Sequence, residues 1–467
     1  MNETRSNAQS HLIPSFTSGR AWRSPDLLVI TRGEGCYVYD TDGNAHLDGL
    51  AGLFCTNLGH GRRDLSAAAH AQMDTLAFYP TWGVANEPAA RAATMIAEEA
   101  PGDLAEVFFV SSGSEAVESA LKLARNYHLS RGDEGRYKVI AREWAYHGTT
   151  LGALAVTGIP KFSEPFRPML WDGVRRVPNT FGEEGPEGGD ASALASVVAI
   201  EQMILAEGPE TVAAVFAEPV QNGRGALVPP PGYWQELRRI CDTYGVLLVA
   251  DEVINSFGRL GHFFGSIRYD VVPDMITFAK GVTSAYLPLG GVIARTPLME
   301  SIRDSPMGLY MHGSTFGGHP VATAVAGAVI EAMRAEDVCG HVLAHEDHLR
   351  TALDALADRH HCVREVRGTG YFYAIELMRD RIQGRDLEAQ EAAALQSGVL
   401  NGLLRDARLL VRPDDRGATM LTIAPPLVAD RAVIDDLVDR VDQVLERTSR
   451  WLEASGLAGS APVPAPA

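Results

Sequence analysis

The chain has 467 residues, a formal net charge of −18, and 46% hydrophobic against 21% charged residues. These values exclude a disordered chain, and the length favours a large domain with a smaller partner domain. The negative charge argues against a nucleic-acid partner, because no basic run offsets it.

The N-terminal segment MNETRSNAQSHLIPSF contains Glu3 and lacks the apolar core of a signal peptide, and no later stretch predicts a transmembrane span. We therefore expect a cytoplasmic protein with no membrane partner. The cysteines are widely spaced and include no CxxC pair, which favours free thiols over metal or redox chemistry. They are Cys36, Cys55, Cys241, Cys339 and Cys362.

Residues 27–47 predict short strands on either side of a DTDG turn. We assign residues 1–75 to the N-terminal segment of a small domain and residues 76–330 to the large domain. From about Leu104 onward, apolar β-rich runs alternate with amphipathic helices, which is typical of an open, mostly parallel α/β sheet flanked by helices. The clearest predicted strands are 106–110, 137–141, 213–219, 246–251 and 274–280.

Further along the chain, helices are predicted over 331–359 and 387–407, followed by short strands around LTIAPP. These elements predict that residues 331–455 complete the small domain, which is then an α/β domain built from both termini. Two segments show no packing pattern: the acidic glycine-rich residues 182–190, and the Pro/Ala-rich residues 456–467, which we expect to be a disordered tail.

Three of the predicted strands end in residues able to do chemistry: Glu218, Asp251 and Lys280. In open α/β sheets ligands gather at the carboxyl ends of the strands, so we expect these side chains to share a site. An amine that forms a Schiff base must be partly deprotonated, which desolvation at the end of a strand favours for Lys280. A buried Asp251 needs a cationic partner, and a protonated pyridine nitrogen would be one. The alternatives are a solvated lysine and a capped buried aspartate.

The motif SSGSEA follows the predicted strand 106–110 and opens a helix, so it places free backbone N–H groups at a helix N-terminus. With the hydroxyls of Ser112 and Ser114, and with Gly113 letting the backbone come close, this turn predicts a phosphate site; an ordinary serine N-cap is the alternative. Two more residues suit a flat ring. Val253 could pack beneath it, and Tyr146 of WAYHG could stack on its opposite face.

The order SSGSEA, YHG, AEPVQ, ADEV, FAKG and STFGGHP resembles the class III (ω-amino acid) branch of the pyridoxal-phosphate-dependent aminotransferases of fold type I. The resemblance runs from about residue 20 to residue 445. It implies the fold-type I architecture, pyridoxal 5'-phosphate as cofactor, and ping-pong transfer of an amino group through a Schiff base on Lys280. It also implies that Lys280, Asp251 and Glu218 are catalytic.

The resemblance assigns the cofactor phosphate to Ser112, Gly113 and Ser114 and the pyridine nitrogen to Asp251. It implies further cofactor contacts for Tyr146 and Val253 on the two faces of the ring, Glu218 near its reactive face, Gln221 at its hydroxyl group, and Thr315 at the phosphate held by the neighbouring subunit. The last contact implies a homodimer, or a tetramer built from it.

One stretch departs from the family pattern. After DEV this chain has Asn255 and Ser256, where the family more often has a Thr-Gly pair. Serine tolerates a left-handed backbone less well than glycine, so the geometry of this loop beside the cofactor stays open.

The stretches GLFCTNLGHG and LAFYPTWG resemble those that line the substrate pocket of ω-transaminases. Phe54, Tyr79 and Trp82, with Tyr146, would make that pocket aromatic; ordinary core packing is the alternative. Arg412 stands where related enzymes carry a mobile arginine that binds a carboxylate in a bidentate contact. Nearby arginines leave this assignment open: Arg405, Arg408 and Arg416. The resemblance implies pyruvate or alanine as one small-molecule partner and an ω-amine, a diamine or a β-amino acid as the other.

Fold and cofactor residues do not determine which bond is broken, so an aminomutase or a decarboxylating enzyme on the same scaffold is an alternative. A catalytically silent cofactor-binding subunit is a second alternative. The presence of Lys280, Asp251 and Glu218 together disfavours it.

Overall fold

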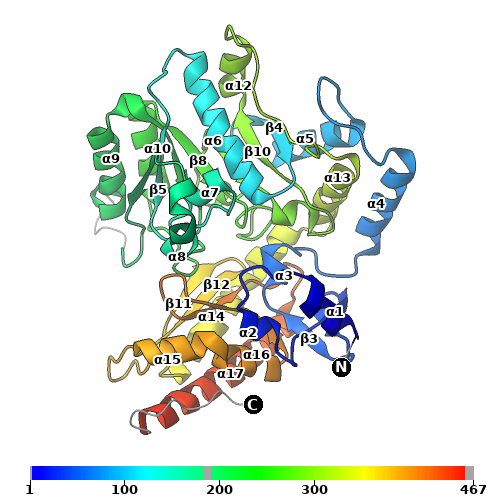
Figure 1. Ribbon diagram of the computed structural model, residues 1–467, viewed down its shortest axis with the longest axis vertical. Coiled ribbons are helices and arrows are strands. Elements are labelled where there is room, and N and C mark those ends of the chain that lie inside the picture. Colours follow the sequence, from blue (N-terminus) through cyan, green and yellow to red (C-terminus); the bar gives the residue numbers. More distant parts are fainter. Residues whose placement is uncertain (1–2, 184–190, 458–467) are drawn as a thin grey trace.

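A large mixed sheet lies at the core of the upper, larger part of the computed structural model, which describes residues 3–183 and 191–457 (Figure 1). In this part of the chain, seven strands form the sheet in the order β4-β10-β9-β8-β7-β5-β6. Strands β5 to β9 run parallel, whereas β10 is antiparallel to both β4 and β9. The strands are β4 Leu104–Val110, β5 Lys138–Arg142, β6 Val174–Val177, β7 Val212–Ala217, β8 Leu247–Asp251, β9 Met275–Phe278 and β10 Gly290–Arg295.

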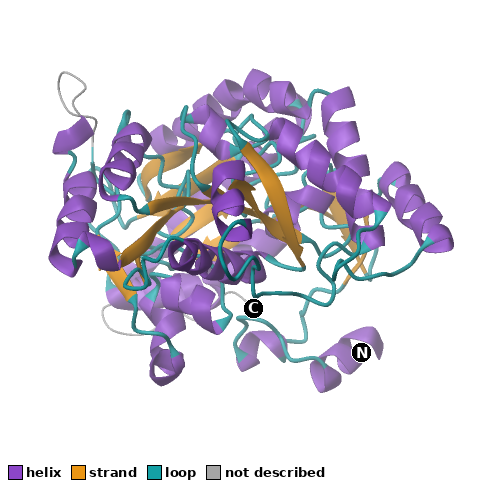
Figure 2. Ribbon diagram, turned by 90° about the horizontal axis from the view of Figure 1, so that it is seen from above, coloured by secondary structure: helices purple, strands orange, loops and turns teal. Residues whose placement is uncertain are grey.

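All five predicted strands are present in this sheet, with ends that shift by one or two residues. Strands β7 and β8 are buried at every residue, because helices cover both faces of the sheet (Figure 2). Such burial on both faces explains why these strands are continuous apolar runs rather than alternating ones. The predicted α/β fold class is confirmed.

The helices around the sheet form where apolar residues recur at helical spacing. Helix α10 buries one stripe made of Tyr233, Trp234, Leu237, Ile240 and Cys241, and a left-handed glycine follows its last residue. The helices of this region are α4 Arg63–Thr75, α5 Glu87–Glu99, α6 Gly113–Ser130, α7 Leu151–Val156, α8 Pro160–Ser163, α9 Ala195–Glu207, α10 Tyr233–Tyr244, α11 Gly265–Arg268, α12 Thr296–Arg303 and α13 Pro320–Ala335, with short 3-10 turns η1 Glu164–Met169, η2 Ala191–Ala193, η3 Pro209–Thr211 and η4 Lys280–Thr283.

Both ends of the chain build the smaller α/β part below the large sheet in Figure 1. Strand β3 from the N-terminal segment pairs in parallel with β13 from the C-terminal segment, which joins the two. The strands are β1 Ile30–Glu34, β2 Tyr37–Asp40, β3 Ala45–Asp48, β11 Val363–Thr369, β12 Phe372–Leu377, β13 Leu409–Leu410, β14 Arg412–Asp414 and β15 Met420–Ile423. The helices are α1 Glu3–His11, α2 Gly19–Trp22, α3 Ala51–Phe54, α14 Val338–Arg359, α15 Ala389–Ala394, the π-helical turn η5 Leu395–Val399, α16 Leu400–Asp406 and α17 Arg431–Leu457.

The prediction of one helix over 331–359 is wrong. Helix α13 ends at Ala335, and Asp337 adopts a left-handed φ of 46° before α14 begins. The carboxylate of Asp337 accepts a hydrogen bond from the backbone N–H of Gly340 at 3.2 Å. The chain therefore turns at a capping aspartate, a signal that apolar periodicity does not carry.

We propose domain limits that follow this turn. Helix α13 packs against α4 and α5, which lie beside the large sheet (Figure 1). Under this proposal the large domain includes α4 and extends to the end of α13, and α14 opens the C-terminal part of the small domain. Residues 184–190 of the glycine-rich segment and 458–467 of the tail lie outside the described residues.

All five cysteines are free thiols. No helix in the described ranges is long and apolar enough to cross a membrane. The cytoplasmic location stays a prediction.

Candidate active site

A cavity lies where the carboxyl ends of the parallel strands meet. Eight predicted site residues line it: Ser112, Gly113, Ser114, Tyr146, Glu218, Asp251, Val253 and Lys280. His147, Gly148 and Ile254 complete the lining. These residues follow β4, β5, β7, β8 and β9, so the sheet itself brings together side chains that are far apart in the sequence.

One wall of the cavity is the N-terminus of α6. Ser112 caps the helix by accepting a hydrogen bond from the N–H of Glu115 at 3.3 Å, and the hydroxyl of Ser114 accepts one from the N–H of Thr149 at 3.1 Å. A Cβ atom on Gly113 would stand only 2.7 Å from Cγ1 of Val253. The first N–H groups of a helix have no partner within it, so this turn offers donors and a positive dipole end to an anion.

The buried carboxylate of Asp251 is held in place at the end of β8. Its Oδ1 accepts hydrogen bonds from the N–H of Val253 at 3.1 Å and from the hydroxyl of Thr277 at 3.0 Å. Its Oδ2 lies 2.6 Å from Nδ1 of His147, a buried residue that the sequence analysis did not single out. A fixed anion in a cavity wall suits a cationic ring nitrogen.

Lys280 begins the 3-10 turn η4 two residues after β9 and has a φ of 49°, which is rare for a residue with a long side chain. Burial lowers its pKa, and this outweighs the opposing charges of nearby acidic groups such as Asp251 and Glu218; the positive charge of Arg412 acts in the same direction as burial. The lowered pKa favours the neutral amine, the form that attacks a carbonyl carbon.

Glu218 is buried after β7. Its Oε1 accepts a hydrogen bond from the N–H of Tyr146 at 3.2 Å and its Oε2 accepts one from the N–H of Asn222 at 3.0 Å. Burial raises the pKa of Glu218. The cavity thus combines an anion site, a fixed carboxylate, an amine and a flat apolar wall, and it fits a planar group that carries a phosphate and a basic ring nitrogen.

The structure does not place Gln221 among the lining residues. Its side-chain amide donates to the carbonyls of Glu143 at 3.0 Å and Gly223 at 3.1 Å, and its backbone pairs with Leu227 in an isolated β-bridge. In the loop after β8, Ser256 does not adopt the left-handed backbone conformation that would have favoured glycine. The positive φ falls on Phe257, and the hydroxyl of Ser256 donates to the carbonyl of Glu252 at 2.6 Å.

The predicted substrate residues divide into two groups. Phe54 is buried against Phe372, with ring centroids 5.5 Å apart, and the guanidinium of Arg412 lies 5.2 Å from its ring. Tyr79 and Trp82 are instead 53% and 66% exposed and do not line the cavity of their own chain, and neither does the exposed Thr315.

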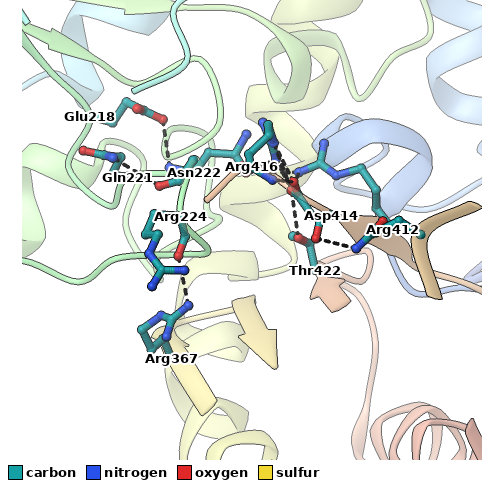
Figure 3. Close-up of polar contacts among 11 residues, drawn as sticks. Glu218, Gln221, Asn222, Arg224, Arg367, Arg412, Asp414, Arg416 and Thr422 are labelled. Atoms are coloured by element: carbon teal, nitrogen blue, oxygen red, sulfur yellow. Dashed lines mark hydrogen bonds and ion pairs between the residues drawn. The ribbon is translucent and has the colours of Figure 1, made fainter. Parts of the chain in front are cut away.

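Two of the four candidate arginines lie near residues that line the cavity. Arg412 and Arg416 both bind Asp414 on β14, and the guanidinium of Arg416 is 5.9 Å from the ring of Tyr146, which lines the cavity (Figure 3). Arg405 forms an ion pair with Asp26 at 3.3 Å on the surface. Arg408 takes a left-handed φ of 50° at the turn before β13.

The geometry and the family comparison agree: the chain belongs to the class III aminotransferases, whose family model matches residues 19–445. It is 45% identical to a probable aminotransferase of Mycobacterium tuberculosis over 90% of each chain, and 36% identical to a putrescine–pyruvate aminotransferase of Pseudomonas aeruginosa over 96% of each chain. A thermostable (S)-enantioselective ω-transaminase from Thermomicrobium roseum superposes with a TM-score of 0.90 at 37% identity, covering 96% of this chain and 98% of that one.

The protein is therefore a pyridoxal-phosphate-dependent aminotransferase with the fold of type I, as its motifs predicted. Its substrates are small amines and keto acids. The comparisons do not favour an aminomutase or a decarboxylating enzyme.

Proposed function

We propose that the enzyme moves an amino group from an ω-amine, a diamine or a β- or ω-amino acid to a keto acid such as pyruvate. The observation that carries this proposal is the convergence of Lys280, Asp251 and Glu218 on one cavity, with Arg412 close enough for its charge to lower the pKa of Lys280. The similarity to a putrescine–pyruvate aminotransferase supports the choice of donor and acceptor.

Under this proposal each group of residues at the cavity has a distinct role. Ser112, Gly113 and Ser114 bind the cofactor phosphate, and Asp251 binds the ring nitrogen. When bound, pyridoxal 5'-phosphate supplies an electrophilic carbon and an electron-withdrawing ring. Lys280, as a neutral amine, would hold the cofactor at that carbon with release of water, and once the substrate amine has displaced it, it would move a proton to and from the amine-bearing carbon of the substrate. Tyr146 and Val253 would contact the two faces of the ring and hold it in place.

Arg412 binds the substrate carboxylate in this proposal. Its Nη2 donates to Oδ2 of Asp414 at 2.8 Å and to Oδ1 of Asn222 at 3.3 Å, while its buried Nε has no hydrogen-bond partner among the described residues. A buried donor without a partner is costly, so a carboxylate that reaches it gains a charge-assisted hydrogen bond. Phe54 below the guanidinium supplies an apolar surface for a partner that carries no carboxylate.

A homodimer completes the proposal. Three predicted residues are exposed and do not line the chain's own cavity: Tyr79, Trp82 and Thr315. They lie on two connected segments, because an added Cβ on Gly313 would stand 3.1 Å from the indole of Trp82. These segments expose a set of large apolar side chains: Phe78, Tyr79, Trp82, Met307, Leu309, Met311 and Phe316. A surface of this kind suits a subunit interface, across which Thr315 would contact the other cofactor.

The test is stopped-flow measurement of the two half-reactions, one with pyruvate and one with a simple amine, in the wild type and in Arg412→Ala. We expect the pyruvate half-reaction to lose about ten-fold to a hundred-fold in kcat/KM, because it loses a charge-assisted contact, and the amine half-reaction to lose far less. Equal losses in both would show that Arg412 is structural. Lys280→Ala should abolish both half-reactions and the visible absorbance that depends on its amine; retention of either would contradict the role of Lys280.

A further inference from the structure

Arg412 and Arg416 share one counter-ion, Asp414, but they share it unequally. Arg416 donates from Nε to both oxygens of Asp414, at 2.8 and 3.0 Å, and also from Nη2, and its backbone N–H donates to Oδ1 at 3.0 Å. Arg412 reaches Asp414 through Nη2 alone, at 2.8 Å. Asp414 is therefore mainly the partner of Arg416 (Figure 3).

The pKa shifts of Arg412, Asp414 and Arg416 reflect the same unequal pairing. Burial opposes both ions, yet the bonds between them hold the pKa of Asp414 well below its usual range and raise that of Arg416. Burial and the charge of Arg416 lower the pKa of Arg412 to about 10, because Asp414 compensates it only in part. The ionised cluster of Arg412, Asp414 and Arg416 has a net positive charge of one unit.

Hydrogen bonds from Arg224 hold the loop that carries Arg416 in place. Arg224 donates through its side chain to the carbonyl of Gly417 at 2.7 Å and through its backbone N–H to the carbonyl of Arg416 at 2.9 Å. The carbonyl of Arg224 in turn accepts a hydrogen bond from Arg367 at 2.9 Å. Asn222 connects the cluster to the catalytic side: its Oδ1 accepts from both guanidinium groups, and its N–H donates to Glu218.

We propose that Arg416 is a positioning residue that determines selectivity for carboxylate substrates: by making most of the bonds to Asp414, it leaves the charge of Arg412 only partly compensated and available to the substrate carboxylate. Without Arg416, the freed Asp414 carboxylate would draw Arg412 into a closed ion pair and compete with the substrate. This inference rests on the proposed role of Arg412 as carboxylate ligand. It concerns a second arginine, which is held by the protein and does not itself need to touch the substrate.

A double-mutant cycle on the holoenzyme tests the inference. The variants are Arg416→Gln, Asp414→Asn and the double variant. The readouts are the Kd of propionate, a carboxylate with no reacting group, and the pyruvate half-reaction relative to the simple-amine half-reaction. Arg416→Gln should weaken propionate binding about ten-fold or more, because Arg412 then pairs with Asp414. The double variant should recover most of that loss, since it again leaves Arg412 without a counter-ion.

Arg416→Lys distinguishes charge from structure. It keeps the positive charge beside Asp414, so we expect propionate binding within a few-fold of the wild type. Equal losses in Arg416→Lys and Arg416→Gln, or no recovery in the double variant while the amine half-reaction is retained, would overturn the inference. Unchanged propionate binding in Arg416→Gln would also overturn it.

Arg412→Ala separates this inference from the proposed function. If that variant binds propionate and reacts with pyruvate as the wild type does, the proposed role of Arg412 fails. If it loses both while Arg416→Gln loses neither, the proposed function stands and only the role of Arg416 fails.

Discussion

At the scale of single residues, the carboxylate of Asp251 has every feature of a fixed anion. It ends a fully buried strand, accepts from Val253 and Thr277, and faces Nδ1 of His147 at 2.6 Å. A buried charge is costly unless it is paired, so a cationic ring nitrogen and Asp251 stabilise each other. The surrounding donors fix the orientation of the carboxylate before the cofactor arrives.

Asp251→Asn should therefore weaken both cofactor retention and proton transfer. The amide keeps the shape of the side chain and removes its charge, and breaking a buried charge pair costs roughly 3 to 5 kcal/mol. We expect a loss of at least about a hundred-fold in single-turnover rate or in cofactor affinity. Absorbance titration of the cofactor-free enzyme and single-turnover kinetics measure the two quantities.

Thr277→Val is the matched control, because it removes one hydrogen bond to Asp251 and keeps the charge. Its expected cost is about 1 kcal/mol, or several-fold. Near-normal turnover in Asp251→Asn, or a loss as large in Thr277→Val, would show that the charge of Asp251 is not what binds the ring.

Single residues also show how far sequence reasoning extends. Asp251, Lys280 and Glu218 were predictable because each follows an apolar strand, and the sheet brings strand ends together. The resemblance implied a ring contact for Gln221, but a motif does not determine the direction of a side chain, and the amide of Gln221 donates to the carbonyls of Glu143 and Gly223. His147 was not singled out although it stands in the YHG motif, and Asp414 was missed, because the sequence does not show which other side chain such a residue holds.

At the scale of elements, the turn from β4 into α6 works only because Gly113 lacks a side chain. Its Cα lies against Val253, the residue proposed to support the ring. The helix terminus and the ring support are therefore in direct contact, so a change in one displaces the other.

Gly113→Ala should raise the Kd of pyridoxal 5'-phosphate roughly ten-fold, because the added methyl group overpacks the contact with Val253 at a cost of about 1 to 3 kcal/mol. Gly402→Ala in α16 is the control. Nothing lies within 4 Å of a Cβ at that position, so the helix should gain about 0.5 to 1 kcal/mol in stability with no change in cofactor affinity. Equal cofactor affinity in both variants would mean that the turn tolerates a side chain and is not a close phosphate cup.

Among the elements, the long apolar strands of the sheet were predictable and the interruptions were not. Strand β6 contains two arginines and β10 begins with two glycines, so neither has the apolar run that marks β7 and β8. The break between α13 and α14 depends on the capping of a helix by Asp337, which a pattern of apolar residues does not register.

At the scale of the whole molecule, the site extends beyond one chain under the proposed assembly. Tyr79, Trp82 and Thr315 were predicted from motifs, yet the single chain leaves all three exposed, on the side of the large domain that carries α4 and α5. Sequence motifs record which residues meet in the working enzyme and do not say which subunit supplies them. A symmetric dimer would account for both observations, because an isologous interface brings the same surface to each partner.

Subunit complementation provides the decisive measurement. Thr315→Glu should inactivate the homodimer, because a carboxylate placed near the phosphate repels it, and Lys280→Ala is inactive for lack of its amine. If Thr315 acts across the interface, a heterodimer of the two variants has one intact site, made of Lys280 from one subunit and Thr315 from the other. Its activity, after purification through two different tags, should match that of a heterodimer of wild type and Lys280→Ala, which also has one intact site.

If Thr315 acts within its own subunit, both sites of the mixed dimer are damaged and no activity returns. Full activity of the Thr315→Glu homodimer would instead remove Thr315 from the site altogether.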